Sequence, residues 1–253
     1  MKLKSRGFPV PYSMHGGYCG HGGAGWFWWR LWRWSGLAAV WLSSPYKGHD
    51  DLNVPVPIVN IERESFYVRG TDAGEFLWKN ESQAFSLGIS YSELFFDAGK
   101  TKNHNLKKLD NRHSTLNAFL QYTLYSPYGH ASIQLLRAPL ITPTLSAAWY
   151  QYPLSLDPVH FTPRVGIRWD SQQQLDYYYG ISGREAQESG LGRYHPQGGV
   201  SPFISLDTRW PFADDWSVIT SSGIIFLNKE IRNNPIVDDN LIFHVTIGLS
   251  YSF

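Results

Sequence analysis

The residue types that nucleophilic chemistry needs lie close together in Leu109–Ser114, a tract that contains Asp110, His113 and Ser114. A serine hydrolase requires a serine nucleophile, a histidine base and an acid that reach one another. Neighbouring residues of a strand point to opposite faces, so His113 and Ser114 cannot pair if this tract leads into a strand. We therefore interpret the tract as the start of a strand and predict that the protein is not an enzyme.

Candidate metal ligands occur in three short tracts, His15-Cys19-His21, Asp50-Asp51 and Asp238-Asp239. Two adjacent carboxylates lack the spaced ligand ladder of a Ca²⁺ site, and solvated loop charge is their ordinary role. Cys19 is the only cysteine, which excludes an intrachain disulfide. We predict no cofactor and no bound metal ion.

The long link Ser171–Gly199 is the best candidate for a binding surface. Ser182 is a suitable N-cap, Glu185 completes a capping-box pattern three residues later, and Gly190 is a suitable stop, which together predict one short helix. The candidate partner-binding residues of this link are Tyr177, Tyr178, Tyr179, Arg184, Glu185 and Tyr194. In the alternative interpretation, which we favour, the helix and the tyrosines fold back as a plug at the open end of the fold.

The elements that position these residues are expected to be strands, and the C-terminal segment 240–253 has the strongest pattern. Its apolar face comprises Leu241, Phe243, Val245, Ile247, Leu249, Tyr251 and Phe253. Its other face is small or polar and comprises His244, Thr246, Gly248, Ser250 and Ser252, with Ile242 as the exception. A strand has period 2, so the two faces meet different environments. The ending Leu249, Tyr251, Phe253 is similar to the assembly signal of outer-membrane barrels.

This alternation also fits a strand of a soluble β-sandwich, and Val159–Asp170 favours a membrane barrel instead. Its polar face carries His160, Arg164 and Arg168, which a soluble core would have to pair but a wet lumen can hydrate. Helical membrane spans are excluded because no apolar run reaches about 18 residues. The net charge of +1 gives no case for a nucleic-acid partner. We predict an all-β fold, an antiparallel transmembrane β-barrel.

Loop lengths give the strand count and the orientation. Strands are expected near residues 240–253, 214–227, 200–210, 158–170, 143–152, 129–138, 113–125 and 83–97, with Val54–Ile61 and one or two strands in Ser65–Asn80 before them. Both ten and twelve strands satisfy the even-number rule, and we favour twelve. Long and short links alternate, as extracellular loops and periplasmic turns do. An aromatic girdle is expected from Trp149, Trp169, Trp210 and Trp216.

Between Ser43 and the C-terminus a series of motifs occurs in a familiar order. The motifs are SPYKGHDDLNVPVPIVNI, FYVRGTDAGEFLWKN, KKLDNRHST, YYYGISGREAQESGLGRY, ADDWS and NNPIVDDN. They resemble the MipA/OmpV family of Gram-negative outer-membrane proteins. The resemblance implies contact with outer-membrane lipid and a scaffold role in peptidoglycan assembly, joining a lytic transglycosylase to a bifunctional penicillin-binding protein. It also implies two alternatives, a small-solute outer-membrane channel and an adhesin-like surface protein.

Residues 1–42 depart from the signal peptide and Gly-rich first strand that the family would have. Met1–Ser5 is basic, but no apolar signal core follows, and six of the eleven tryptophans lie between residues 26 and 41. One interpretation is an interfacial anchor. The other is a frameshift over Arg6–Leu42, because tryptophan codons read one nucleotide later become glycine codons. On that hypothesis the barrel domain spans 43–253, and this chain lacks its first strand and is not exported.

Overall fold

The computed structural model describes residues 32–92, 94–137 and 144–253 of the chain. One antiparallel sheet contains every strand of this described part. In chain order the strands are β1 Trp32–Leu42, β2 Leu52–Glu62, β3 Phe66–Arg69, β4 Asp72–Lys79, β5 Gln83–Tyr91, β6 Leu116–Ser126, β7 Gly129–Arg137, β8 Thr144–Gln151, β9 Leu154–Leu156, β10 Val159–Asp170, β11 Gly199–Pro211, β12 Trp216–Phe226 and β13 Leu241–Ser252.

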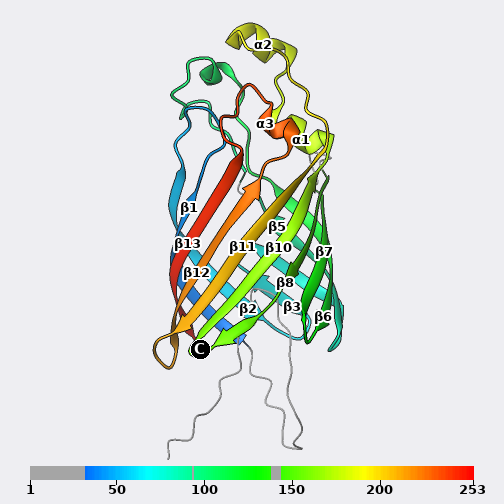
Figure 1. Ribbon diagram of the computed structural model, residues 1–253, viewed down its shortest axis with the longest axis vertical. Helices are drawn as coiled ribbons and strands as arrows, with labels where there is room; N and C mark the ends of the chain where they lie inside the picture. The colour runs from blue at the N-terminus through cyan, green and yellow to red at the C-terminus, as the bar shows by residue number, and fades with distance from the viewer. Residues whose placement is uncertain (1–31, 93, 138–143) are drawn as a thin grey trace, which may run out of the picture.

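The sheet closes on itself as a barrel (Figure 1). β1 pairs with β13 on one side and with β2 on the other, and β10 pairs with β11. The short strand β9 follows β8 along the same edge of β10, so together they fill one place in the wall. The wall therefore has the twelve strands that were favoured. The segment Ser65–Asn80 supplies two of them, β3 and β4.

The barrel begins at Trp32, ahead of the boundary expected at Ser43. β1 completes the closure, with Leu37 opposite Leu249 on β13 and opposite Pro57 on β2. Residues of β1 alternate between the outside and the lumen with the period of 2 of a barrel strand. Leu37 is 63% exposed and Ala38 only 3%. The absent first strand that the frameshift hypothesis assumed is therefore present. Residues 1–31, on which the rest of that hypothesis depends, lie outside the described residues.

Alternate residues of each strand face the lumen and the outside, as predicted for β10. Val165 and Ile167 on its outer face are 54% and 50% exposed. On the inner face, Arg164 forms an ion pair of 3.0 Å with Asp207 of β11. Opposite charges thus meet inside the barrel, where water and partners offset the loss of bulk hydration.

Three of the four tryptophans expected in the girdle lie on the outer surface near strand ends. Trp169, Trp210 and Trp216 are 41%, 48% and 44% exposed. Trp149 departs from the expectation because it lies inside, opposite Gly166 of β10, and its indole nitrogen is buried. Its neighbour Tyr150 takes the outward place on β8 and is 43% exposed.

The two ends of the barrel differ. Short turns and the C-terminus lie at one end, and all helices of the described residues lie at the other (Figure 1). These helices are η1 Leu106–Lys108, α1 Gln172–Tyr179, α2 Gly183–Ser189 and α3 Lys229–Arg232. In the described part of the chain, no helix is long and apolar enough to cross a membrane. In outer-membrane barrels the long loops face the exterior and the short turns face the periplasm.

Candidate functional site

Four long loops form a packed layer over one end of the barrel, which we call the cap. Within the described residues they are 43–51, 92 with 94–115, 171–198 and 227–240. The largest apolar core of the described residues lies mainly in this layer, not within the barrel wall. Its members include Tyr46, Phe96, Leu106, Leu175, Tyr178, Tyr179, Ile181, Ile231 and Ile236. The loops that would ordinarily be mobile are therefore held by buried apolar contacts.

The expected helix of the third loop is α2, and its ends are those that the sequence predicts. Ser182 caps the helix by accepting a hydrogen bond from the backbone N–H of Glu185, whose carboxylate accepts one from the backbone N–H of Ser182. Gly190 ends the helix with a φ of 75°, a left-handed conformation that favours glycine. The sequence prediction missed α1, which Ser171 caps through Gln174 N–H.

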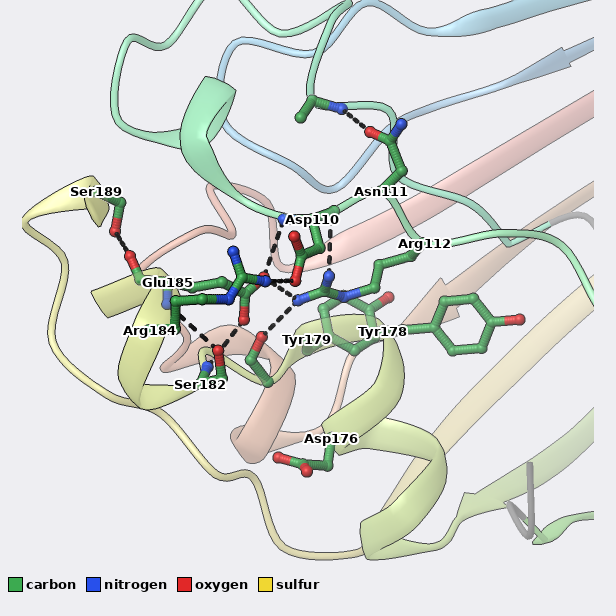
Figure 2. A network of polar contacts seen from close by, with 12 residues as sticks. Asp110, Asn111, Arg112, Asp176, Tyr178, Tyr179, Ser182, Arg184, Glu185 and Ser189 are labelled. Atoms are coloured by element: carbon green, nitrogen blue, oxygen red, sulfur yellow. Dashed lines mark hydrogen bonds and ion pairs between the residues drawn. The ribbon is translucent and has the colours of Figure 1, made fainter. Parts of the chain in front are cut away.

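Glu185 is the centre of a polar network that joins two loops (Figure 2). Its carboxylate accepts hydrogen bonds from the guanidinium of Arg112 at 2.7 Å and from the backbone N–H of Asp110 at 3.0 Å. Arg112 also donates to the backbone oxygen of Gly180 at 3.1 Å. The Asp110 carboxylate pairs with Arg184 on the exposed side. The network therefore fixes α2 to the loop that precedes β6.

This network determines the charge state of Glu185. Burial alone would raise the pKa of the carboxyl, but hydrogen bonds from the Ser182 backbone, Arg112 and the Asp110 backbone outweigh it. Together they lower the pKa of Glu185 to about 2. The side chain is 3% exposed and that of Arg112 is 12% exposed, so the pair is largely shielded from water. A charge-assisted pair in such surroundings is stronger than an exposed one.

Two of the predicted tyrosines lie at the bottom of the cap. Tyr178 and Tyr179 are each 1% exposed. Tyr46 donates from its hydroxyl to the backbone oxygen of Tyr178 at 3.2 Å, and its ring stacks on that of Tyr179 at 5.5 Å. Burial raises the pKa of Tyr46 well above its ordinary value, so the hydroxyl remains neutral. These contacts agree with the favoured interpretation of a plug.

The six predicted partner-binding residues thus separate into two groups. Tyr178, Tyr179 and Glu185 are buried and hold the cap together. Arg184 is exposed, whereas Tyr177 and Tyr194 are only partly exposed. Tyr177 accepts from the backbone N–H of His113 at 3.2 Å, and Tyr194 donates to the backbone oxygen of Glu230 at 2.7 Å.

The tract considered for nucleophilic chemistry lies in the cap, immediately before β6. Within the described residues, no hydrogen bond connects the side chains of Asp110, His113 and Ser114; the carboxylate of Asp110 instead contacts Arg184. No group of three or more histidine, cysteine, aspartate or glutamate residues in that part of the chain is placed to hold a metal ion.

The residues of the predicted assembly signal lie at the opposite end, on the strand that closes the barrel. Leu249 and Tyr251 face outward and are 48% and 39% exposed, and Phe253 is 63% exposed. The ring of Tyr251 lies 5.2 Å from that of Trp216 on β12. Ser252 pairs with Trp34 of β1, so the signal residues border the seam between β13 and β1.

A closed antiparallel barrel with an apolar outer surface, a polar interior and long loops at one end is the architecture of an outer-membrane β-barrel protein. The chain belongs to the family described as MltA-interacting protein MipA, which matches residues 35–253. The resemblance seen in the sequence is thereby confirmed, as is the outer membrane as its location.

The chain is similar to two named relatives and to a solved structure. The chain is 33% identical to the MltA-interacting protein of Escherichia coli K12 over 217 residues, covering 83% of this chain and 85% of the relative. It is 29% identical to the putative outer membrane protein YiaT of the same organism, over 86% of this chain and 89% of the relative. The translocator domain of the autotransporter NalP from Neisseria meningitidis aligns over 92% of this chain and 90% of its own, with 12% identity and a TM-score of 0.37.

Proposed function

We propose that the chain is a non-enzymatic outer-membrane scaffold that holds a lytic transglycosylase next to a bifunctional penicillin-binding protein during peptidoglycan assembly. The observation that carries the proposal is the similarity to a protein named for its interaction with MltA, which extends over 83% of the chain. The packed cap agrees with a structural role, because its buried polar groups, such as Glu185 and Arg112, bind the loops to one another.

The location of the cell wall decides which end of the barrel such partners meet. Peptidoglycan lies beneath the outer membrane, so its enzymes meet the short turns and not the cap. The residues of these turns are exposed and mainly acidic, namely Glu64, Glu81, Asp157, Asp214 and Asp215, with Arg63 as a basic neighbour. Two aromatic side chains stand among them, Tyr128 at 81% exposed and Phe212 at 51%. Aromatic anchors surrounded by charge are typical of a protein interface.

This placement changes the expectation for the cap residues. Tyr177, Arg184 and Tyr194 lie at the end opposite to the turns, so a murein enzyme in the periplasm does not reach them. We propose that the partner instead docks on the acidic turn surface through a basic patch. Complementary charge would then direct the encounter and make it sensitive to salt.

A pull-down from a solubilised envelope tests both parts of the proposal. The tagged chain should retain a lytic transglycosylase and a penicillin-binding protein, identified by mass spectrometry. The triple variant Asp214→Asn, Asp215→Asn, Tyr128→Ser should lose most of both enzymes. Arg184→Ala in the cap is the matched control and should retain them. Absence of any murein enzyme from the wild-type sample would contradict the scaffold, and equal loss in the Arg184 variant would contradict the docking surface.

A further inference from the structure

The barrel wall is incomplete on one side, next to β2. β2 pairs with β3 only at Asn60–Glu62, because the β3–β4 hairpin turns back at Gly70, whose N–H donates to the oxygen of Val59. Above that turn, no strand of the described residues pairs with the β3-facing edge of Leu52–Ile58. β3, with 4 residues, is therefore much shorter than β2, with 11 residues, which leaves a gap beside β2 in the half of the barrel nearest the cap.

The sequence of β2 fits an unpaired edge. Backbone groups of alternate residues point to the same side of a strand, and the oxygen of Val59 points toward β3. The backbone groups of Pro57 and Pro55 point to the same side of β2 as those of Val59. Their nitrogens, which carry no hydrogen, therefore lie along the unpaired edge. An unpaired N–H in lipid costs several kcal/mol, and proline removes that donor. The gap is thus prepared for contact with lipid.

At the end nearest the cap, the gap beside β2 is bordered by two loops that contact each other. The backbone N–H of Lys102 donates to the oxygen of Gly48 at 2.7 Å, and Lys102 forms an ion pair with Asp50 at 2.5 Å. At the other side, the N–H of Tyr91 donates to the oxygen of Thr71 at 3.2 Å. We call the opening bounded by β2, Thr71, Tyr91 and Asp50 the lateral window.

A cavity of about 370 Å³ lies below α1. Its lining includes Thr71 and Tyr91, which border the lateral window, and Arg168 on the inner face of β10. Its volume lies within the range of small-molecule sites, about 300–1,000 Å³. The apolar lining residues contributed by β2, β5 and the segment after β5 are Leu52, Tyr91, Leu94 and Phe95.

The inner part of the cavity offers hydrogen-bonding groups. Gln174 of α1 lines the cavity and is 6% exposed, and its backbone N–H donates to the hydroxyl of Ser171 at 3.2 Å. Arg168 uses its Nε to donate to Asp170 at 3.1 Å, which leaves its terminal nitrogens directed elsewhere. Both side chains line the cavity and carry N–H donors for a polar ligand group.

We propose that the lateral window admits a single-chain amphiphile from the outer leaflet, with its acyl chain between β2 and Phe95 and its acceptor-bearing head against Gln174 and Arg168. The apolar outer part and the donor-bearing inner part match the two ends of such a molecule, a fatty acid being the simplest. The proposal is independent of the scaffold function, since the window lies at the end of the barrel away from the acidic turns.

Photo-crosslinking tests the proposal with the full chain refolded in phosphatidylcholine vesicles. The probe is a fatty acid with a diazirine near the chain end, and mass spectrometry locates the labelled peptides. Label should appear on Leu52, Tyr91 or Phe95, and excess unlabelled fatty acid should suppress it. A diazirine-labelled phosphatidylcholine, which carries two chains, should label the outer surface without saturation.

Two variants make the test specific. Thr71→Trp, which fills the base of the window, and Gln174→Leu, which removes the head contact, should each lower saturable labelling about tenfold, equivalent to roughly 1.4 kcal/mol of binding free energy. Thr220→Trp on the outer face of β12 is the control and should leave labelling unchanged. Heat-modifiable migration verifies that each variant is folded. Unsaturable labelling, or labelling unaffected by Thr71→Trp in the folded variant, would overturn the proposal.

Discussion

Glu185 is the residue on which the polar contacts of the cap converge, and its charge is needed for them. Its pKa is lowered from 4.5 to about 2, so it stabilises the cap above pH 4.5, and that stabilisation is lost as pH falls toward 2. The shift corresponds to about 3 kcal/mol. We expect hydrogen exchange in residues 171–198, corrected for intrinsic rates, to show much easier opening at pH 3 than at pH 7.

Substitution separates this effect from general acid damage. Glu185→Gln should open the cap at pH 7 and remove most of the difference between pH 7 and pH 3. Glu188→Gln is the control, because Glu188 is exposed and contacts only Arg184, at 3.5 Å. Slow exchange at pH 7 in the Glu185 variant would mean that the apolar core alone holds the cap.

The direction in which each side chain of β10 points, toward lipid or toward the lumen, can also be tested at single residues. Val165→Arg places a charge on the lipid side and should lower the free energy of unfolding by about 2–4 kcal/mol near the membrane midplane. Arg164→Val should lower it by much less, since Asp207 keeps its hydrogen bond from Ser221 and access to lumen water. Urea titration in lipid vesicles measures both. Equal losses would show that the two residues share a similar environment.

Single elements show what the sequence could and could not predict. The period-2 pattern located β5 to β8 and β10 to β13 but not the three-residue β9, and the capping box located α2, because both signals are local. β1 could not be predicted because Trp32, Trp34 and Trp41 interrupt the sequence of a typical Gly-rich first strand, although Leu37 and Ala38 alternate as a barrel strand requires. α1 was missed because it has no comparable apolar face, with Gln172 and Gln173 exposed, and it is held by packing against distant loops.

The closing strand provides a prediction about assembly. Phe253 follows β13 directly and is 63% exposed, so it contributes little to the packing of the folded barrel. Its deletion should nevertheless lower the amount of heat-modifiable protein in the outer membrane, because we expect the assembly signal to be recognised during membrane insertion. Phe212→Ser, at the same end of the barrel and also exposed, is the control. An unchanged yield after deletion would remove the support for an assembly signal.

The prolines of β2 give a prediction about the unpaired edge. Pro55→Ala and Pro57→Ala each add an N–H with no partner, and together they should lower the free energy of unfolding in lipid. Pro163→Ala in β10 is the matched control. Pro163 accepts from Tyr152 N–H at 3.1 Å, so an added N–H would face the paired strand and find an acceptor. A stabilised Pro55, Pro57 variant would imply that the edge is covered.

At the scale of the whole molecule, the chain divides its interior into two environments. The largest buried apolar core of the described residues lies mainly in the cap, whereas the lumen holds ion pairs such as Arg164–Asp207 and Arg69–Glu62. A membrane barrel can be built in this way because its wall is stabilised by hydrogen bonds and by lipid on its apolar face. The cap then needs its own core, and the long loops provide it.

This division predicts how the protein conducts ions. The cap covers the mouth with buried side chains, among them Tyr178 and Tyr179, so the wild-type chain in a planar bilayer should show little steady conductance. Opening the cap should expose a polar lumen, and a variant with residues 172–197 replaced by a short Gly-Ser link should conduct. Glu185→Gln should give intermittent openings at pH 7, with Glu188→Gln silent as its control. Large, steady conductance in the wild type would favour the channel that the family resemblance left open, and would mean that the cap moves aside in the membrane.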